Sequence, residues 1–452
     1  MEPVTFAVLV VFVGTYIAIS SEKVNRTAAA LLGMGLIGVV LVVTRTSTFR
    51  HVVELIEWHT VLFVTAMMAI VTIAAGSGMF QYLAIQLTRP SHGLTKRLFV
   101  YFLSFVFVIS IFLDTTSTML IMAPLTIEVC KALEIDFKPF LIAEAVVCNF
   151  ASIPTIVGAV PNLVIAEAAS LDQGLLFVLM MPLSMLLFGV SVPIFLYFFN
   201  KQLTQADTDL VEEFLLIDAS YMIRSRRDFY LSVIGIGVLV VGFTLGHTIG
   251  FQPSMIAIVV AAFLLLLTRE WVDDVLKKIN WGTVFFLIGL FGLVAALQIT
   301  GVIVALGDTI ESIIGANEAF GVLFMCWVPS LVSAVVDNIP IATILAPIAT
   351  GLASTSWLLP YVLIFAVNVG GFILPIGAPA NILAISLSEK ERNPIRFYDF
   401  ARIATPLGLL MLVVGTGWFL LVGVFGILPV FLAGIVIASV MLVVSMRLFL
   451  KA

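Results

Sequence analysis

The chain has 452 residues, of which 62% are hydrophobic and 11% are charged, and its formal net charge is −5. A soluble domain carries about 25% charged residues, so this composition excludes a water-soluble globular protein. It predicts an all-α polytopic membrane protein.

Apolar stretches recur along the whole chain, and a helix needs about 20 apolar residues to cross a bilayer. The first stretch follows Glu2 and no basic residue, so we interpret it as a span and not as a cleaved signal peptide. About eleven spans are predicted, at 4–20, 27–44, 60–80, 139–170, 174–199, 229–249, 254–268, 282–300, 358–386, 403–424 and 427–446. Two further stretches, 98–132 and 319–353, each resemble a re-entrant hairpin with two apolar arms and an acidic tip.

The positions of Lys and Arg predict the orientation, because these residues concentrate on the cytoplasmic side of a membrane. Basic residues cluster at 89–97, 131–138, 224–227, 277–278 and 390–402, whereas the connections at 171–173, 250–253, 302–318 and 354–357 have none. This pattern predicts an outside N-terminus, a cytoplasmic C-terminus and a cytoplasmic linker at 200–228; Arg45 and Arg50 do not fit it. The first hairpin then enters from the cytoplasm and the second from outside.

The two halves of the chain repeat each other. At an offset of 223 residues the matched pairs are Trp58 and Trp281, Gly78 and Gly301, Asp114 and Asp337, and Pro124 and Pro347. At an offset of 219 they are Asn149 and Asn368, Gly158 and Gly377, and Asn162 and Asn381. We therefore divide the chain into a first repeat (1–199), a linker (200–228), a second repeat (229–424) and an additional C-terminal span (427–452). Five full spans in the first repeat would invert the second, as in many secondary transporters.

One acidic residue stands at each hairpin tip, Asp114 and Asp337, inside a long apolar field. A carboxylate at the centre of a bilayer costs about 2.5–3.5 kcal/mol or more, so it is a functional-site hypothesis by default. The neighbouring Thr115, Thr116 and Asn338 are further candidate ligands. The alternative is a water-exposed turn, with hydroxyls that bond only to their own helix.

Glycine and proline interrupt a predicted span in each half, between Asn149 and Asn162 and between Asn368 and Asn381. Interruptions free backbone groups, which are tolerated at membrane depth only where protein or a water-filled cavity satisfies them. Freed carbonyls suit a cation, and helix N-termini suit an anion. The alternative is a packed proline kink with asparagines bonding across helices. The candidate ligands are Asn149, Thr155, Gly158, Asn162, Asn368, Gly377 and Asn381.

Other chemistry is weakly represented in the sequence. Glu144 and Glu167 are candidates for a proton relay or for interfacial residues. The chain shows no nucleophile–base or metal-ligand constellation, so we expect neither an enzyme nor a bound cofactor, apart from Na⁺ as a coupling ion. It has no P-loop, so ATP-driven pumping would need a separate ATPase subunit.

These motifs resemble the ion transporter superfamily, in the group of arsenical-pump membrane proteins, D-type sodium–proton antiporters and the melanosomal P protein, which is related to sodium–dicarboxylate symporters. The group's Asp-Asn tip is matched by Asp337-Asn338, and the shared Gly-x-x-Pro-Asn pattern runs from Gly158 to Asn162. Asp114-Thr115 departs from the pattern, and Ala159 stands where P-protein relatives often have an acidic residue.

The resemblance implies a secondary active transporter of a small inorganic ion, coupled to Na⁺, H⁺ or both. Cation/proton antiport and arsenite or anion transport both fit, and a sodium-coupled citrate-type di- or tricarboxylate symporter is the alternative. An ion channel is a third interpretation that the repeat disfavours. The resemblance also implies a multi-pass protein of the plasma membrane, a homodimer in the lipid bilayer, with no nucleic-acid partner.

Overall fold

The computed structural model describes residues 3–20, 24–91, 94–205, 219–249, 251–268, 272–315 and 317–449. Every regular element within these ranges is a helix, which confirms the predicted all-α class. Residues 206–218 of the predicted linker, with its acidic residues, lie outside the described ranges, as do the last three residues of the chain.

Six helices in the described ranges are long and apolar enough to cross a membrane. They are α2 (Arg26–Val43), α4 (Trp58–Gly76), α10 (Gln173–Phe198), α15 (Trp281–Ile299), α17 (Glu318–Val335) and α21 (Phe397–Phe425). Further apolar helices are α1 (Pro3–Ser20), α12 (Arg226–Ile249), α13 (Pro253–Leu267) and α22 (Ile427–Phe449). The chain is therefore an integral, multi-pass membrane protein.

One expected span ends earlier than predicted. Instead of a single helix over 60–80, α4 ends at Gly76 and α5 (Met79–Thr88) begins after a break at Gly78, whose φ is +85°. A Cβ atom at Gly78 would lie 1.9 Å from the carbonyl oxygen of Met222. Both the positive φ and this close approach require glycine.

The segments around the predicted site form helix pairs and interrupted helices. The first pair is α6 (Thr95–Ser110) and α7 (Thr115–Ala132), and the second is α17 and α18 (Asn338–Gly351). The first interrupted helix is α8 (Lys138–Ala151) followed by α9 (Val160–Ala168), and the second is α19 (Leu359–Ile373) followed by α20 (Pro379–Lys390). The short elements are α3 (Phe49–Glu54), α14 (Val272–Lys278), α16 (Val302–Ile314), η1 (Arg89–Ser91), η2 (Ala219–Met222) and η3 (Leu352–Ser354).

The helices repeat with the same offsets as the sequence motifs. The starts of α1, α4, α5, α6 and α7 recur 223 residues later in α12, α15, α16, α17 and α18. The start of α9 recurs 219 residues later in α20. The sequence repeat is therefore also a repeat of helical elements.

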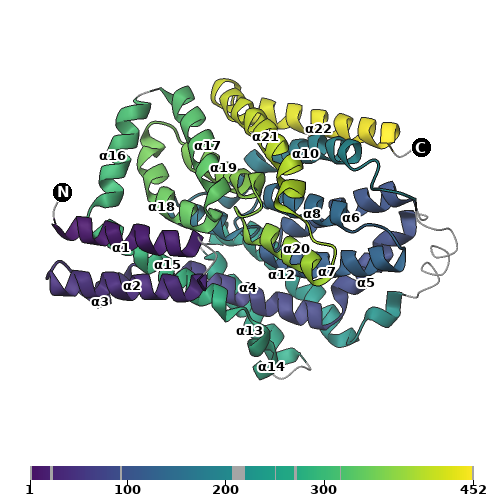
Figure 1. The fold of residues 1–452 in the computed structure, drawn as a ribbon, viewed down its shortest axis with the longest axis horizontal. Helices are drawn as coiled ribbons and strands as arrows, with labels where there is room; N and C mark the ends of the chain where they lie inside the picture. The colour runs from purple at the N-terminus through teal and green to yellow at the C-terminus, as the bar shows by residue number, and fades with distance from the viewer. Residues whose placement is uncertain are drawn as a thin grey trace.

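The two halves interlock by exchanging helices (Figure 1). Helix α15 of the second half packs against α1 and α2, and α4 of the first half packs against α12 and α13. Helices α7 and α18 likewise pack against the interrupted-helix segments of the opposite half, α20 and α9. Every residue of α19 is buried, as is every residue of α8 after Lys138, so these two helices form the centre of the molecule. Figure 1 shows α22 at its edge, where it packs on α10 and α21.

Candidate functional site

Each hairpin aspartate caps the helix that follows it. Asp114 Oδ1 accepts hydrogen bonds from the backbone N–H groups of Thr116 (3.0 Å) and Ser117 (3.1 Å). Asp337 Oδ1 accepts one from Ile339 N (3.0 Å). A carboxylate at this position satisfies unpaired donors of the first helical turn and complements the helix dipole. Both aspartates therefore have a structural role at the tips, whatever further ligand they hold.

An asparagine side chain closes each helix interruption. Asn162 Nδ2 donates to the carbonyl oxygens of Ser152 and Thr155, at 2.8 Å each. In the second half Asn381 Nδ2 donates to Gly371 O (2.8 Å) and Leu374 O (3.2 Å). The carbonyls that the interruptions free are thus satisfied by protein, as burial at membrane depth requires.

The four asparagines also pair between the halves at the centre of the molecule. Asn368 Nδ2 donates to Asn162 Oδ1 (2.6 Å), and Asn149 Nδ2 donates to Asn381 Oδ1 (3.3 Å). All four residues have no solvent exposure. The repeat brings together two equivalent amide pairs from segments more than 200 residues apart in the chain.

The two amide pairs differ in one additional hydrogen bond. Ser152 Oγ donates to Asn149 O (2.7 Å) and shares its single proton with Asn368 Oδ1 (3.3 Å). The matching residue in the second half is Gly371, which has no hydroxyl, and Asn149 Oδ1 has no hydrogen-bond partner among the described residues. A Cβ atom added to Gly371 would lie 3.4 Å from Asn149 Oδ1 and 3.2 Å from Asn338 Nδ2. Asn149 therefore presents a buried oxygen that is free to accept a donor or to ligate a cation.

The predicted glycines permit close backbone packing. A Cβ on Gly158 would lie 2.4 Å from Ser152 O, and a Cβ on Gly377 would lie 2.7 Å from Gly371 O. Thr155 Oγ1 donates to Ile111 O near the first tip and accepts from Gly158 N. Gly377 O accepts from Asn338 N at the second tip (3.2 Å). These residues attach each tip to the neighbouring interruption.

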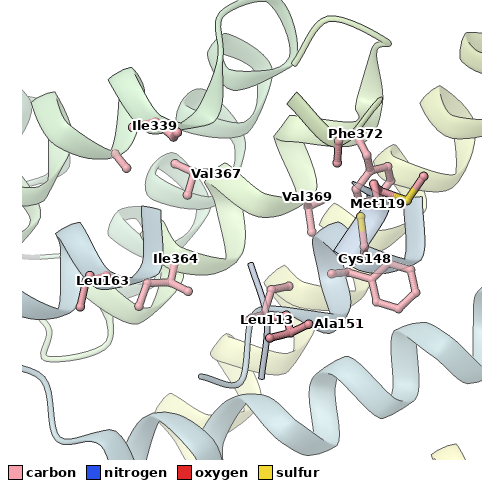
Figure 2. Close-up of a cluster of buried hydrophobic side chains, with 14 of the residues drawn as sticks. Leu113, Met119, Cys148, Ala151, Leu163, Ile339, Ile364, Val367, Val369 and Phe372 are labelled. Carbon is pink, nitrogen blue, oxygen red and sulfur yellow. The ribbon is translucent and has the colours of Figure 1, made fainter. Parts of the chain in front are cut away.

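Several residues next to the asparagines in sequence, including Cys148, Leu163, Val367 and Val369, are buried and belong to one hydrophobic cluster (Figure 2). Figure 2 shows Leu163 of α9 and Ile364 of α19 together at one end of this cluster, with Leu113 and Ala151 nearer its middle. All four are buried. Their packing keeps bulk water from the amide pairs, so hydrogen bonds there are costly to break.

A cavity of about 500 Å³ lies beside this centre. Thr116 lines it from the start of α7, Asp337 from the tip before α18 and Pro379 from the start of α20. The N-termini of α7, α18 and α20 therefore face one space, where the Asp114 and Asp337 carboxylates cap the first two. The other polar lining residues are Tyr16, Arg26, Asn280 and Ser386.

Arg26 brings a full positive charge to the cavity wall. Its Nη1 lies 3.6 Å from Asp337 Oδ2, and its guanidinium lies 5.4 Å from the centre of the Phe286 ring. The sequence places Arg26 only as a basic residue after the first span. The Asp337 carboxylate therefore has a basic partner in the wall of the cavity. Tyr16 also lines the cavity, and its buried hydroxyl has no hydrogen-bond partner among the described residues.

The predicted residues thus fall into two sets. Thr116 and Asp337 line the cavity, whereas the four asparagines lie in the buried centre beside it. Thr115 is buried, and Asp114 does not line the cavity. The lining residues that the sequence did not indicate, such as Arg26 and Tyr16, belong to α1 and α2, outside the two motifs. Only their position in the fold identifies them.

Comparison with known proteins points to one transporter family. The family model described as "Citrate transporter" (CitMHS) matches residues 16–365. A 46 kDa membrane protein of Mycobacterium leprae is 28% identical over 400 residues, which cover 87% of this chain and 93% of that protein. An uncharacterized transporter of Synechocystis is 27% identical over 89% of this chain and 94% of its own length. The P protein of Sus scrofa is 25% identical over 90% of this chain and 58% of its own length. The resemblance to the P-protein group of the ion transporter superfamily is confirmed.

Proposed function

Because the chain belongs to the citrate transporter family, we propose that this membrane transporter is a secondary active carrier of a small carboxylate anion of the di- or tricarboxylate class. Na⁺ or H⁺ is the coupling ion. The carrier works in the plasma membrane.

The observation that carries this proposal is the cavity beside the asparagine pairs. Its volume of about 500 Å³ lies within the range of about 300–1,000 Å³ found for small-molecule sites and is far larger than a bare ion needs. Arg26 supplies a guanidinium, whose planar fork matches a carboxylate. The N-terminus of α20, which has no side-chain cap, supplies further attraction for an anion.

The helical repeat supports alternating access. The matched helix offsets and the exchange of helices between the halves are the features expected of an inverted repeat with two re-entrant hairpins and about eleven spans. In such carriers the substrate site lies where the repeats meet. The cavity has lining residues from both halves, as this arrangement requires.

The buried centre supports a site for the coupling cation. Hard cations take oxygen ligands, and Asn149 Oδ1 is a buried oxygen without a hydrogen-bond partner among the described residues. A cation beside it would reduce the repulsion between a substrate anion and Asp337. Binding of cation and substrate would then be mutually favourable.

A second candidate is cation/proton antiport of an inorganic ion. Asp337 favours it, because its carboxylate lines the same cavity and could bind a cation or a proton in turn. In that case Arg26 would hold the carboxylate in place and would not contact the substrate.

Uptake into proteoliposomes distinguishes the two candidates. We would measure citrate, succinate, arsenite and ²²Na⁺ uptake with and without Na⁺ and pH gradients. For a carboxylate carrier, Arg26→Gln should lower uptake of the transported acid at least tenfold. The matched control Arg50→Gln removes an exposed arginine that pairs with Glu54 outside the cavity and should leave uptake unchanged. Acid uptake by Arg26→Gln at the wild-type rate and KM, or ²²Na⁺ exchange without any acid uptake, would contradict the proposal.

A further inference from the structure

Glu144 is a buried carboxyl group that the proposed substrate site does not use. It lies on α8 and has no solvent exposure. Its Oε1 accepts a hydrogen bond of 2.6 Å from Thr126 Oγ1 on α7, and its Oε2 has no partner among the described residues. A charged carboxylate in this position would have a single hydrogen bond and no contact with water, so the site as built accommodates the neutral acid.

The repeat shows that the fold does not need a polar pair at this position. The residues of the second half that match Glu144 and Thr126 are Leu363 and Ala349, at offsets of 219 and 223. Both are fully buried, as Glu144 and Thr126 are. An apolar pair therefore fills the equivalent space, and the first half has a carboxyl group where packing alone requires none.

The surroundings of Glu144 hold few ionisable groups. Helix α8 packs against α6, α7, α10, α19 and α20, and neither α10 nor α19 contains a charged residue. The other ionisable side chains within the buried parts of α7 and α8 are the thiols of Cys130 and Cys148. The charged residues of the packed elements stand in end turns or on the outer face of α7: Lys96 and Arg97 on α6, Glu128 and Lys131 on α7, Lys138 on α8, and Glu389 and Lys390 on α20.

Along α8, Glu144 lies between the end of the helix that begins at Lys138 and the buried Asn149. The connection at 133–137, whose polar residues are Glu134 and Asp136, precedes this helix, and Asn149 follows Glu144 by five residues. On α7, Cys130 follows Thr126 by one helical turn, so it lies on the same face of the helix and closer to this connection. Because Glu144, Thr126 and Cys130 are all buried, a proton reaches Glu144 only in a conformation that admits water between α7 and α8.

We propose that Glu144, held by Thr126 between α7 and α8, is the binding site of a coupling proton. This inference rests on the proposed carrier function and specifies its coupling ion. The carboxylate takes a proton from water on one side of the membrane, crosses between conformations as the neutral acid and returns the proton to water on the other side. The neutral form lets this part of the protein move relative to the apolar layer without carrying an uncompensated charge.

Chemical labelling tests the protonated state without measuring transport. Dicyclohexylcarbodiimide adds to protonated carboxyl groups in apolar surroundings, and the adduct can be located by mass spectrometry of the full-length protein in membranes. We expect an adduct on Glu144 at pH 6 to 7 that decreases at high pH, and none on the exposed Glu128. An unmodified Glu144 at every pH would overturn the proposal, even if the protein transports a carboxylate.

Transport by a designed variant tests coupling. The double change Glu144→Leu with Thr126→Ala copies the residues of the second half and should therefore fold. At equal pH on both sides, its rate of citrate counterflow should stay within about twofold of the wild-type rate. With a pH gradient, its accumulation of citrate should be at least tenfold lower than that of the wild type. The control Glu128→Gln should behave as the wild type. An unchanged response of the double variant to the pH gradient would overturn the role of Glu144. Failure of the wild type to carry any tested acid would instead refute the proposed function, and the labelling result would still stand.

Discussion

The unequal hydrogen bonding of the two asparagine pairs leads to a quantitative prediction. Asn162 makes two hydrogen bonds of 2.8 Å to backbone carbonyls and accepts one of 2.6 Å from Asn368. Asn381 makes bonds of 2.8 and 3.2 Å and accepts one of 3.3 Å. We predict that Asn162→Leu destabilises the protein more than Asn381→Leu, although the two residues are equivalent in the repeat.

The size of the effect follows from the groups that lose their partners. Leucine has as many side-chain heavy atoms as asparagine but is larger, so both variants share an overpacking cost of about 1–3 kcal/mol, and the difference between them comes from the polar groups. A buried group left without a partner costs about 1–3 kcal/mol. Asn162→Leu removes the bonds to Thr155 O and from one amide N–H of Asn368. Among the described residues, it leaves Ser152 O with only the 3.4 Å bond from Thr155 N. We expect a loss of about 3–6 kcal/mol for Asn162→Leu. Two of the bonds lost in Asn381→Leu are near the upper limit of hydrogen-bond length, so we expect about 2–4 kcal/mol there.

Thermal unfolding of the purified protein in detergent, followed by size-exclusion chromatography, ranks the variants. Asn393→Leu is a suitable control, because Asn393 makes one partly buried side-chain bond, to Asp136 at 3.2 Å, and it should lose about 1 kcal/mol. A lower Tm for Asn381→Leu than for Asn162→Leu would refute the reasoning. So would a Tm for Asn162→Leu equal to that of the control.

Three further outcomes follow from matched pairs in the repeat. Gly158→Ala and Gly377→Ala should each cost about 1–3 kcal/mol of stability, because the added Cβ meets backbone oxygens. The control is Gly237, an exposed helical residue with nothing near its Cβ position, where alanine should raise stability by about 0.5–1 kcal/mol. Equal Tm values for all three variants would show that the close approach is unimportant. Trp58→Phe and Trp281→Phe each remove a 3.0 Å hydrogen bond from the indole N–H to a carbonyl five residues earlier, so each should lower the free energy of unfolding by about 1 kcal/mol. Clearly different losses in equilibrium unfolding would argue against equivalent roles for the two tryptophans. Single cysteines at Glu134 and Thr355 should react with an impermeant maleimide from opposite sides of the membrane; labelling of both from one side would exclude the inverted repeat.

Much of the architecture could be predicted from local patterns. The hydrophobic stretches, the interruptions with glycine and proline, and the two offsets in the repeat are properties of nearby or equally spaced residues, so they identify the helical class and the interrupted helices. The break at Gly78 recurs at Gly301, which also has a positive φ (+72°) but has nothing within 4 Å of a Cβ, so the break belongs to the repeat, and only the approach of Met222 to Gly78 depends on a distant part of the chain. The span predicted over 60–80 was therefore too long.

The sequence by itself determined that this protein is an all-helical membrane transporter with two related halves, because apolar composition, helix breakers and repeated motifs act through local physical rules. The tertiary structure decided which residues meet. Asparagines that look alike in the sequence pair across the halves, and one serine in place of glycine makes the pairs unequal. Arg26 enters the cavity because α2 begins beside Asp337. Glu144, which could equally have been interfacial, lies in the core because α8 packs against five other helices. Such contacts depend on packing between distant segments, and no local pattern records them.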